Sequence, residues 1–297
     1  MKIIYQLIIA AILFSANICI AQQDSNFGVL VMAHGGSEQW NQGVIDTVSP
    51  LHENYNVEIA FGMADAFSIQ EAVHKLEAKG SEKIAVVRLF VSGESWFERT
   101  QQILGLTDGA PERPSADPHA AHDMHPPAHR MEFWKIDSNA QFALSTQGLA
   151  DAELMAQVLL TRANELSDDA DKEDVLILAH GPEDDAENQR WLEKIEQRSA
   201  LLHEQHSFRT VHVATLREDW KDKREAAETH VRGLVESANS SGGTALIIPF
   251  RVHGFGPYED VFAGLDYRAN QVGLIPHPAV TQWIEQQVQI LDGTFHH

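Results

Sequence analysis

Two short apolar runs that end in the same three residues organise the hydrophobic pattern of this chain. Residues 29–36 read VLVMAHGG, and residues 175–182 read VLILAHGP. A continuous apolar run that a glycine closes is typical of a buried strand in a parallel sheet. Ligands of open α/β sheets bind beyond the carboxyl ends of such strands. The pattern therefore predicts that His34 and His180 stand at the functional edge of a sheet.

The pattern of the first half alternates between the periods of strands and helices. It predicts strands over 28–33, 57–61, 84–91, 131–136 and 141–145, and helices over 38–55, 68–79 and 150–166. Ser68, with Glu71 three residues later, has the pattern of a capping box at the start of the second helix. Prolines indicate a loop over residues 105–130. An acidic hinge at 167–174 ends this half.

The second half repeats the plan of the first. After the strand expected at 174–179, the pattern predicts strands over 210–214, 245–250 and 272–275, and helices over 184–203, 218–238 and 279–291. We therefore expect an α/β fold of two similar Rossmann-like halves, each a parallel sheet flanked by helices, that face each other across a cleft. The halves are expected at 27–167 and 174–297, with an insertion at about 106–130 in the first.

The N-terminal residues have the pattern of a secretory signal peptide. A lysine precedes a mostly apolar stretch over 3–20, and Ala21 is a suitable cleavage point. A single membrane anchor is the alternative, and three polar interruptions favour the signal peptide: Gln6, Ser15 and Asn17. We expect residues 1–21 to be removed and the protein to be exported, to the periplasm, without stable membrane association. This cleavage would also remove Cys19, the only cysteine. The mature protein would then have neither disulfides nor thiolate metal ligands.

The charge and the missing motifs exclude several classes of function. A formal net charge of -21 disfavours a nucleic-acid backbone or an anionic membrane surface as partner, and it is compatible with cations or with solubility alone. The chain has no phosphate loop and no dinucleotide fingerprint, so we expect no nucleotide cofactor. It has no Gly-x-Ser-x-Gly elbow of an esterase. Ala33 and Ala179 stand where histidine phosphatases have an arginine.

His34 and His180 are the first candidates for chemistry, because they occupy equivalent places in the two halves. A neutral imidazole can bind a divalent metal or accept a proton near neutral pH. A lone histidine at a strand end is often only structural, but the repetition favours a functional role. We expect both histidines to be catalytic and to bind metal.

Further candidates follow the third strand of each half. Glu94 and Ser95 follow this strand in the first half, while His253 follows its counterpart, with Glu259 and Asp260 nearby. Imidazoles with carboxylates suit Co²⁺, Ni²⁺, Fe²⁺ or Zn²⁺. We expect Glu94 to join the catalytic set and His253 the metal set. Ser95, Glu259 and Asp260 are accessory candidates. For each of these three, and for Glu94, taken alone, a solvated loop residue is an alternative of at least equal weight.

The proline-rich loop carries a separate cluster of histidines within DPHAAHDMHPPAHR: His119, His122, His125 and His129. Closely spaced imidazoles can collect a metal ion without a preformed fold. Metal capture and a plain polar insertion are both open interpretations of this loop.

The order of these motifs resembles that in the CbiX-type sirohydrochlorin chelatases. The duplication resembles the long form of that family, which has two halves. The resemblance is carried by His-Gly after the first strand, the Phe-Val-Ser-Gly turn at 90–93, Ile-Leu-Gly-Leu at 103–106 and a late Gly-Leu before a helix, and it covers about 27–291. It implies a class II chelatase fold that inserts Co²⁺, or Fe²⁺ or Ni²⁺, into a tetrapyrrole such as sirohydrochlorin. It also implies that His34 or His180 presents the metal and takes pyrrole protons while a carboxylate assists.

Two features depart from that family. The family has a second histidine two residues after the glycine of the third-strand turn, where this chain has Ser95 and Gly256. His253 is the candidate substitute. A signal peptide is also unexpected for tetrapyrrole synthesis. The alternative is therefore an exported, non-catalytic protein that binds a metal or a tetrapyrrole. The metal, the tetrapyrrole and the oligomeric state stay open.

Overall fold

The computed structural model describes residues 26–114 and 131–296 of the chain. The expected signal peptide and the four histidines of the proline-rich loop lie outside the described residues, so both stay predictions. No helix of the described residues has the length and apolar character that a membrane span requires.

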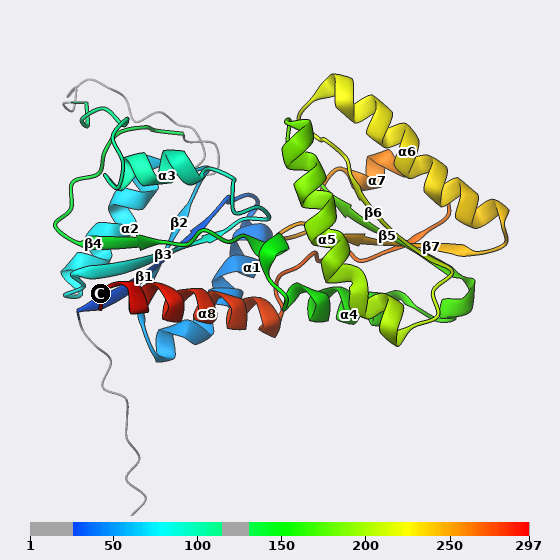
Figure 1. The fold of residues 1–297 in the computed structure, drawn as a ribbon, viewed down its shortest axis with the longest axis horizontal. Helices are drawn as coiled ribbons and strands as arrows, with labels where there is room; N and C mark the ends of the chain where they lie inside the picture. Colours follow the sequence, from blue (N-terminus) through cyan, green and yellow to red (C-terminus); the bar gives the residue numbers. More distant parts are fainter. Residues whose placement is uncertain (1–25, 115–130, 297) are drawn as a thin grey trace, which may run out of the picture.

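Two four-stranded parallel sheets form the framework, one in each half (Figure 1). The strand orders are β2-β1-β3-β4 and β6-β5-β7-β8. The strands are β1 (Phe27–Ala33), β2 (Asn56–Phe61), β3 (Lys83–Leu89), β4 (Gln141–Leu144), β5 (Glu173–Ala179), β6 (Thr210–Thr215), β7 (Thr244–Pro249) and β8 (Arg268–Ala269). The central strands β1 and β5 are buried along their whole length, as their continuous apolar runs require. The prediction of two similar parallel sheets flanked by helices is confirmed.

The helices lie on both faces of the sheets, and most begin close to their predicted positions. They are α1 (Glu38–Val48), α2 (Ala66–Ala78), α3 (Phe97–Ile103), α4 (Met155–Leu166), α5 (Asp185–Gln205), α6 (Lys221–Ser240), α7 (Tyr258–Val261) and α8 (Pro278–Thr294). The predicted cap of α2 is wrong. Asp65 caps this helix, because its carboxylate accepts a hydrogen bond from the Ser68 N–H at 2.9 Å.

Two of the predicted strands, 131–136 and 272–275, are not strands in the structure. Instead of a ladder, each makes a few hydrogen bonds to a turn or a helix. Ile136 N donates to the carbonyl of Ile103 at the end of α3, and Leu274 N donates to that of Arg251, which follows β7. Both segments are apolar because they cover the core, which is why their sequence resembles that of a strand.

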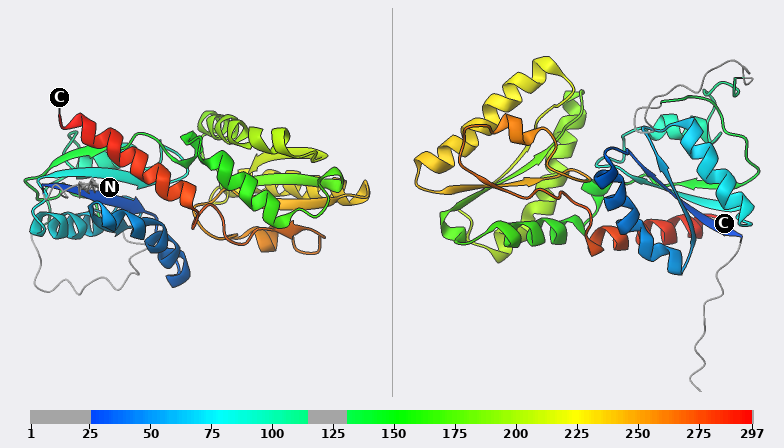
Figure 2. Two further views of the ribbon diagram at one scale, coloured as in Figure 1. Left: turned by 90° about the horizontal axis from the view of Figure 1, so that it is seen from below. Right: turned by 180° about the vertical axis from the view of Figure 1, so that it is seen from behind.

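The last helix of each half packs on the other half. Helix α8 lies against β3, β4 and α1 of the first half, whereas α4 lies against α5 and β7 of the second (Figure 1). The other views in Figure 2 agree, with α8, in red, alongside the first half. Arg162 of α4 holds the crossing by donating to the carbonyls of Gly273 and Pro276 at 2.9 and 3.0 Å. The predicted bounds 27–167 and 174–297 thus describe the sequence repeat, while the packing crosses between the halves.

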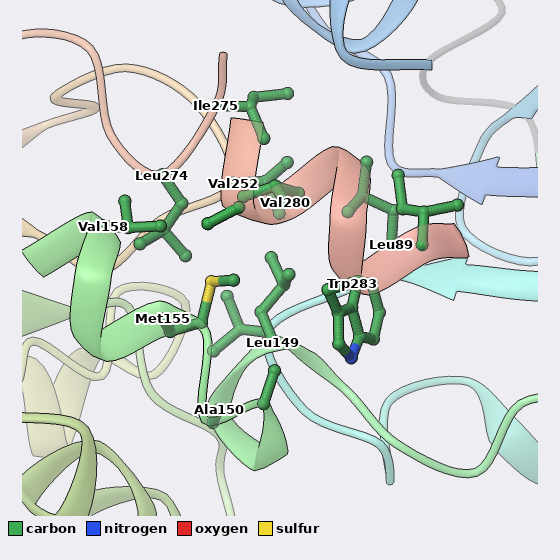
Figure 3. Close-up of a cluster of buried hydrophobic side chains, with 14 of the residues drawn as sticks. Leu89, Leu149, Ala150, Met155, Val158, Val252, Leu274, Ile275, Val280 and Trp283 are labelled. Carbon is green, nitrogen blue, oxygen red and sulfur yellow. The ribbon is translucent and has the colours of Figure 1, made fainter. Parts of the chain in front are cut away.

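A single hydrophobic cluster joins the halves at this crossing. Figure 3 shows Leu149 and Met155 facing Leu274, Val280 and Trp283, and all five side chains are buried. Because these residues come from both crossing segments, separating the halves would expose a common core to water. The crossing therefore sets the relative position of the two sheet edges that carry His34 and His180.

Candidate functional site

A cavity of about 1100 Å³ opens between the carboxyl ends of the two sheets. Both strand-end histidines line it, His34 after β1 and His180 after β5. The glycine that follows each histidine has a positive φ, +79° at Gly35 and +77° at Gly181, so the chain turns away and leaves the imidazole at the edge. The repeated Ala-His-Gly motif thus delivers two histidines to one cavity.

His34 is exposed, and its ring orientation is defined by its own turn. Its Nδ1 lies 2.8 Å from the carbonyl oxygen of Gly35. A carbonyl only accepts, so Nδ1 carries the proton, and Nε2 of the neutral ring keeps its lone pair. This is the tautomer that binds a metal or takes a proton through Nε2. The ring of Trp40 stands edge-on to His34 at 6.4 Å between centroids.

His180 has a more enclosed setting than His34. Its ring centroid lies 4.9 Å from that of the buried Trp191. Burial lowers the pKa of His180 to about 4 from 6.5, and the charges of Arg251 and His34 act in the same direction, opposed by Asp219. A neutral imidazole is therefore available at His180 well below neutral pH, which suits a metal ligand more than a proton acceptor.

The low pKa of His180 makes the stability of the fold depend on pH. Below pH 6.5 the unfolded chain takes up a proton that the folded chain resists, so stability is lost as the pH falls from 6.5 to about 4. We expect the free energy of unfolding, measured in urea, to be lower at pH 4.5 than at pH 7.5 in the wild type. In His180→Gln this decrease should be smaller by about 2–3 kcal/mol. His203→Gln, an exposed position on α5, is the control. Equal pH dependence in all three proteins would contradict the assignment.

His253 reaches across the cavity from the second half to the first. It is partly buried, and burial lowers its pKa. A Cβ atom on Gly43 of α1 would lie 2.6 Å from Cδ2 of the His253 ring, so the ring rests on the helix backbone where only glycine leaves room. The structure thus brings His253 to the same cavity as His34 and His180.

Glu94 also lines the cavity, but its carboxylate is bound by the opposite half. Arg190 of α5 holds it with two hydrogen bonds, Nε to Oε1 at 2.9 Å and Nη2 to Oε2 at 2.5 Å. These hydrogen bonds lower the pKa of Glu94. Glu94 stays ionised, and Arg190 engages both of its oxygens, so this arginine competes with any other group for the carboxylate. Its catalytic role stays a prediction.

A buried arginine in β3 positions the turn that carries Glu94 and Ser95. Arg88 donates to the carbonyls of Gly93 and Ser95, each at 2.7 Å, and to that of Ser145. Burial lowers the pKa of Arg88 to about 10, against the opposing effect of the Asp151 charge. A charged residue within the apolar run of β3 was the available sequence signal for this role.

The remaining predicted residues divide between the cavity and the surface. Ser95 lines the cavity, whereas Glu259 and Asp260 are exposed on α7 and do not belong to its lining. Within residues 26–114 and 131–296, no group of three or more histidine or carboxylate side chains is arranged to hold a metal ion. The metal set His34, His180 and His253 is therefore not preassembled there and stays a prediction.

Sequence reasoning missed most of the cavity wall. Four indole side chains line it, from different elements: Trp40, Trp96, Trp191 and Trp220. An acidic run directly after the second Ala-His-Gly also lines it, together with the ion pair between Glu218 and Arg251. The run at 183–187 was visible in the sequence, but the indoles meet only through the tertiary fold.

The comparisons with known proteins agree with this architecture. Residues 28–132 match the CbiX family. A segment of 94 residues, 30% of this chain, is 31% identical to the sirohydrochlorin cobaltochelatase of Methanothermobacter thermautotrophicus and spans 66% of that protein. Among solved structures, the chain resembles the sirohydrochlorin chelatase SirB from Bacillus subtilis subspecies spizizenii in complex with cobalt, with a TM-score of 0.56 and 12% identity over 89% of this chain and 94% of that one.

A second structure, SirB from Bacillus subtilis with Fe³⁺, has a TM-score of 0.59 and 13% identity over the same shares of the two chains. The multi-domain protein DR2241 from Deinococcus radiodurans has a TM-score of 0.52 and 17% identity, and the similarity covers 90% of this chain and 55% of that one. The fold is thus of the chelatase type, with one chelatase-like sheet in each half. The chain belongs to the CbiX family, with the sequence match in its first half and the chelatase fold across both halves.

Proposed function

We propose that this protein is a metal chelatase that inserts a divalent ion, Co²⁺ first among the candidates, into a tetrapyrrole held in the cavity between its halves. Fe²⁺, Ni²⁺ and Zn²⁺ are the other candidate metals, and sirohydrochlorin is the first tetrapyrrole to test. The observation that carries the proposal is the pair of equivalent histidines, His34 and His180, which open into one cavity of about 1100 Å³. A cavity of this size lies just above the usual range of small-molecule sites, about 300–1000 Å³.

The chemistry needs a metal carrier and a proton acceptor on the macrocycle. Two pyrrole N–H protons must leave as the metal enters, so a neutral base beside the metal lowers the barrier. His34 suits the proton acceptor, since its Nδ1 carries the proton, its Nε2 keeps the lone pair, and its exposed ring lines the cavity. His180 suits the metal ligand, since burial keeps its imidazole neutral. The metal is a substrate in this scheme, and three partly exposed indoles of the lining, Trp40, Trp96 and Trp220, are available to contact a flat macrocycle.

The proposal is tested by following the absorbance of sirohydrochlorin after Co²⁺ is added to the purified protein. We expect a rate that increases with protein concentration and exceeds the uncatalysed rate. A rate equal to that without protein would reject catalysis. The variants that assign the residues are described in the Discussion.

A non-catalytic binding protein is the second candidate, and the ion pair between Glu94 and Arg190 favours it. The pair occupies the carboxylate that a chelatase would use, and Ser95 and Gly256 stand where family members have histidines. This candidate predicts tight metal or tetrapyrrole binding without turnover. Calorimetry that detects neither ligand would reject it.

We also propose that the protein is exported to the periplasm after cleavage behind Ala21. The apolar stretch at 3–20 and the small residue that follows it support this proposal. Mass spectrometry of the protein recovered from a periplasmic extract should give a chain that begins at Gln22. A replacement of Ala21 by a bulky residue should slow the cleavage. An intact N-terminus and a cytoplasmic location would contradict the proposal.

A further inference from the structure

An exposed ion pair between the halves stands at the rim of the cavity. Arg190 of α5 binds Glu94, which lines the cavity, and so do Glu187 and Trp191, the neighbours of Arg190 on the same helix. The Arg190 side chain is 46% exposed and that of Glu94 43%. Both partners of the pair are therefore open to solvent at a place that a ligand in the cavity can reach.

Arg190 has donors left over for a ligand. Among the described residues, its hydrogen bonds go to Glu94 alone, and they use two of the five N–H donors of a guanidinium. A carboxylate is the group that the planar guanidinium fork binds best. Arg190 can therefore turn from Glu94 to a carboxylate of a ligand without losing any contact with the backbone.

The other cations near the cavity are fixed more firmly. Arg217 and Lys223 each donate to the backbone carbonyl of Glu183. The guanidinium of Arg251 packs over Gly256, where a Cβ atom would lie 2.7 Å from its Cζ. None of these three side chains can turn to a ligand without giving up a contact with the backbone.

A second ion pair holds α5 against the first half without Glu94. Lys194, four residues beyond Arg190, places its Nζ 2.8 Å from Oδ1 of Asp151. The other oxygen of this carboxylate accepts a hydrogen bond from the Gly148 N–H at 2.8 Å. Release of Glu94 by Arg190 would therefore leave α5 in place.

We propose that Arg190 binds a carboxylate of the tetrapyrrole, and that this exchange releases the carboxylate of Glu94 into the cavity. The inference rests on the proposed function, because it assumes that a tetrapyrrole enters the cavity. Sirohydrochlorin carries its carboxylates on the periphery of the ring, so a ring inside the cavity directs them toward the rim. The exchange replaces one carboxylate by another, so the guanidinium stays paired throughout.

The exchange also changes the basicity of Glu94. The hydrogen bonds from Arg190 are the main cause of the low pKa of Glu94. Once they are transferred to the ligand, the pKa of Glu94 rises and its carboxylate becomes a stronger base for a pyrrole proton. Binding of the substrate would thus prepare the group that deprotonates it.

The test measures binding of metal-free sirohydrochlorin through quenching of the tryptophan fluorescence, because four indoles line the cavity. Glu94→Gln should tighten binding about threefold, since the ligand no longer displaces a charged competitor. Arg190→Gln should weaken binding about threefold, the size expected of an exposed ion pair. In the insertion assay, Arg190→Gln should raise KM for sirohydrochlorin and keep kcat, whereas Glu94→Gln should lower kcat.

Two further variants separate the exchange from a general effect of charge. In the double variant, Glu94→Gln should have no effect beyond that of Arg190→Gln, because the competition needs the arginine. Long-range charge alone would instead return the double variant to the wild-type affinity. The matched control is Glu183→Gln, which removes an exposed charge from the same lining without freeing an arginine and should keep the wild-type affinity.

The outcomes separate this inference from the proposed function. Circular dichroism should show that each variant is folded. Wild-type affinity in the double variant, or binding by Glu94→Gln that is no tighter than in the wild type or in Glu183→Gln, would overturn the inference and leave the proposed function intact. Absence of sirohydrochlorin binding by the wild type would overturn the proposed function, and the inference with it.

Discussion

Replacing both strand-end histidines, His34→Ala with His180→Ala, should lower the protein-dependent rate of cobalt insertion into sirohydrochlorin by at least about 100-fold, the range of general-base catalysis. The reason is that the two side chains supply the proton acceptor and the neutral metal ligand of the proposed reaction. Both line one cavity, and the exposed ring of His34 keeps the lone pair of its Nε2. The measurement is the initial absorbance change under conditions in which the uncatalysed rate is subtracted.

The matched control for this variant removes two histidines that do not line the cavity. His203→Ala with His230→Ala changes exposed positions on α5 and α6 and should keep the wild-type rate. Circular dichroism and the unfolding midpoint should show that the cavity variant is folded. A folded cavity variant that turns over as fast as the control would mean that the histidines are not catalytic. Loss of rate with retained metal binding would assign them to proton transfer.

Gly148→Ala should lower the free energy of unfolding by about 3 kcal/mol, as expected for an atom forced into filled space. A Cβ atom there would lie 2.4 Å from the carbonyl carbon of Ser92 and 2.5 Å from the nitrogen of Gly93. Both are backbone atoms and cannot rotate away. The clash would also displace the turn that carries Glu94. Urea unfolding, followed by circular dichroism, gives the free energy.

Gly233→Ala is the control for this substitution. Gly233 is exposed within α6, and a Cβ atom there would meet no atom within 4 Å. This variant should gain about 0.5–1 kcal/mol, because alanine favours the helix over glycine. Equal stability of the two alanine variants would show that the Gly148 turn relaxes freely, against the close approach described above.

The repeated Gly-Leu motif gains a physical explanation from the same contacts. Gly148 lies against the turn after β3, and Gly273 lies against the equivalent turn after β7, where a Cβ atom would be 3.0 Å from the Arg251 carbonyl oxygen. In each half the next residue donates to this turn, Leu149 to Phe90 and Leu274 to Arg251. The sequence repeat is therefore explained by a close approach that only glycine permits.

The local pattern of apolar residues was sufficient to predict the strands that are buried on both faces. β1 and β5 were predicted from their apolar runs because a parallel strand between helical layers has no polar face. Pattern failed for 272–275 and for the cap of α2. In the second case Ser68 and Glu71 have the local signature of a cap. However, the Asp65 carboxylate also accepts a hydrogen bond from the Glu132 N–H, which is far away in the sequence.

The residues of the candidate site also divide into those that the sequence predicted and those that depend on the tertiary structure. His34 and His180 were predictable because each directly follows a recognisable strand. The ion pair between Glu94 and Arg190 was not predictable, since 96 residues separate the two in the sequence. They meet only because the two halves pack face to face. The contact between the His253 ring and Gly43 also depends on this packing of the two halves.

The sequence by itself determined the two parallel sheets, the duplication and the two histidines, because these depend on period and on neighbouring residues. The tertiary structure decided which half each terminal helix covers, since the apolar faces of α4 and α8 contain no local signal for one sheet over the other. It also decided the charge and the indole walls of the cavity. Those properties belong to a space between two surfaces, and such a space exists only after both halves have folded and met.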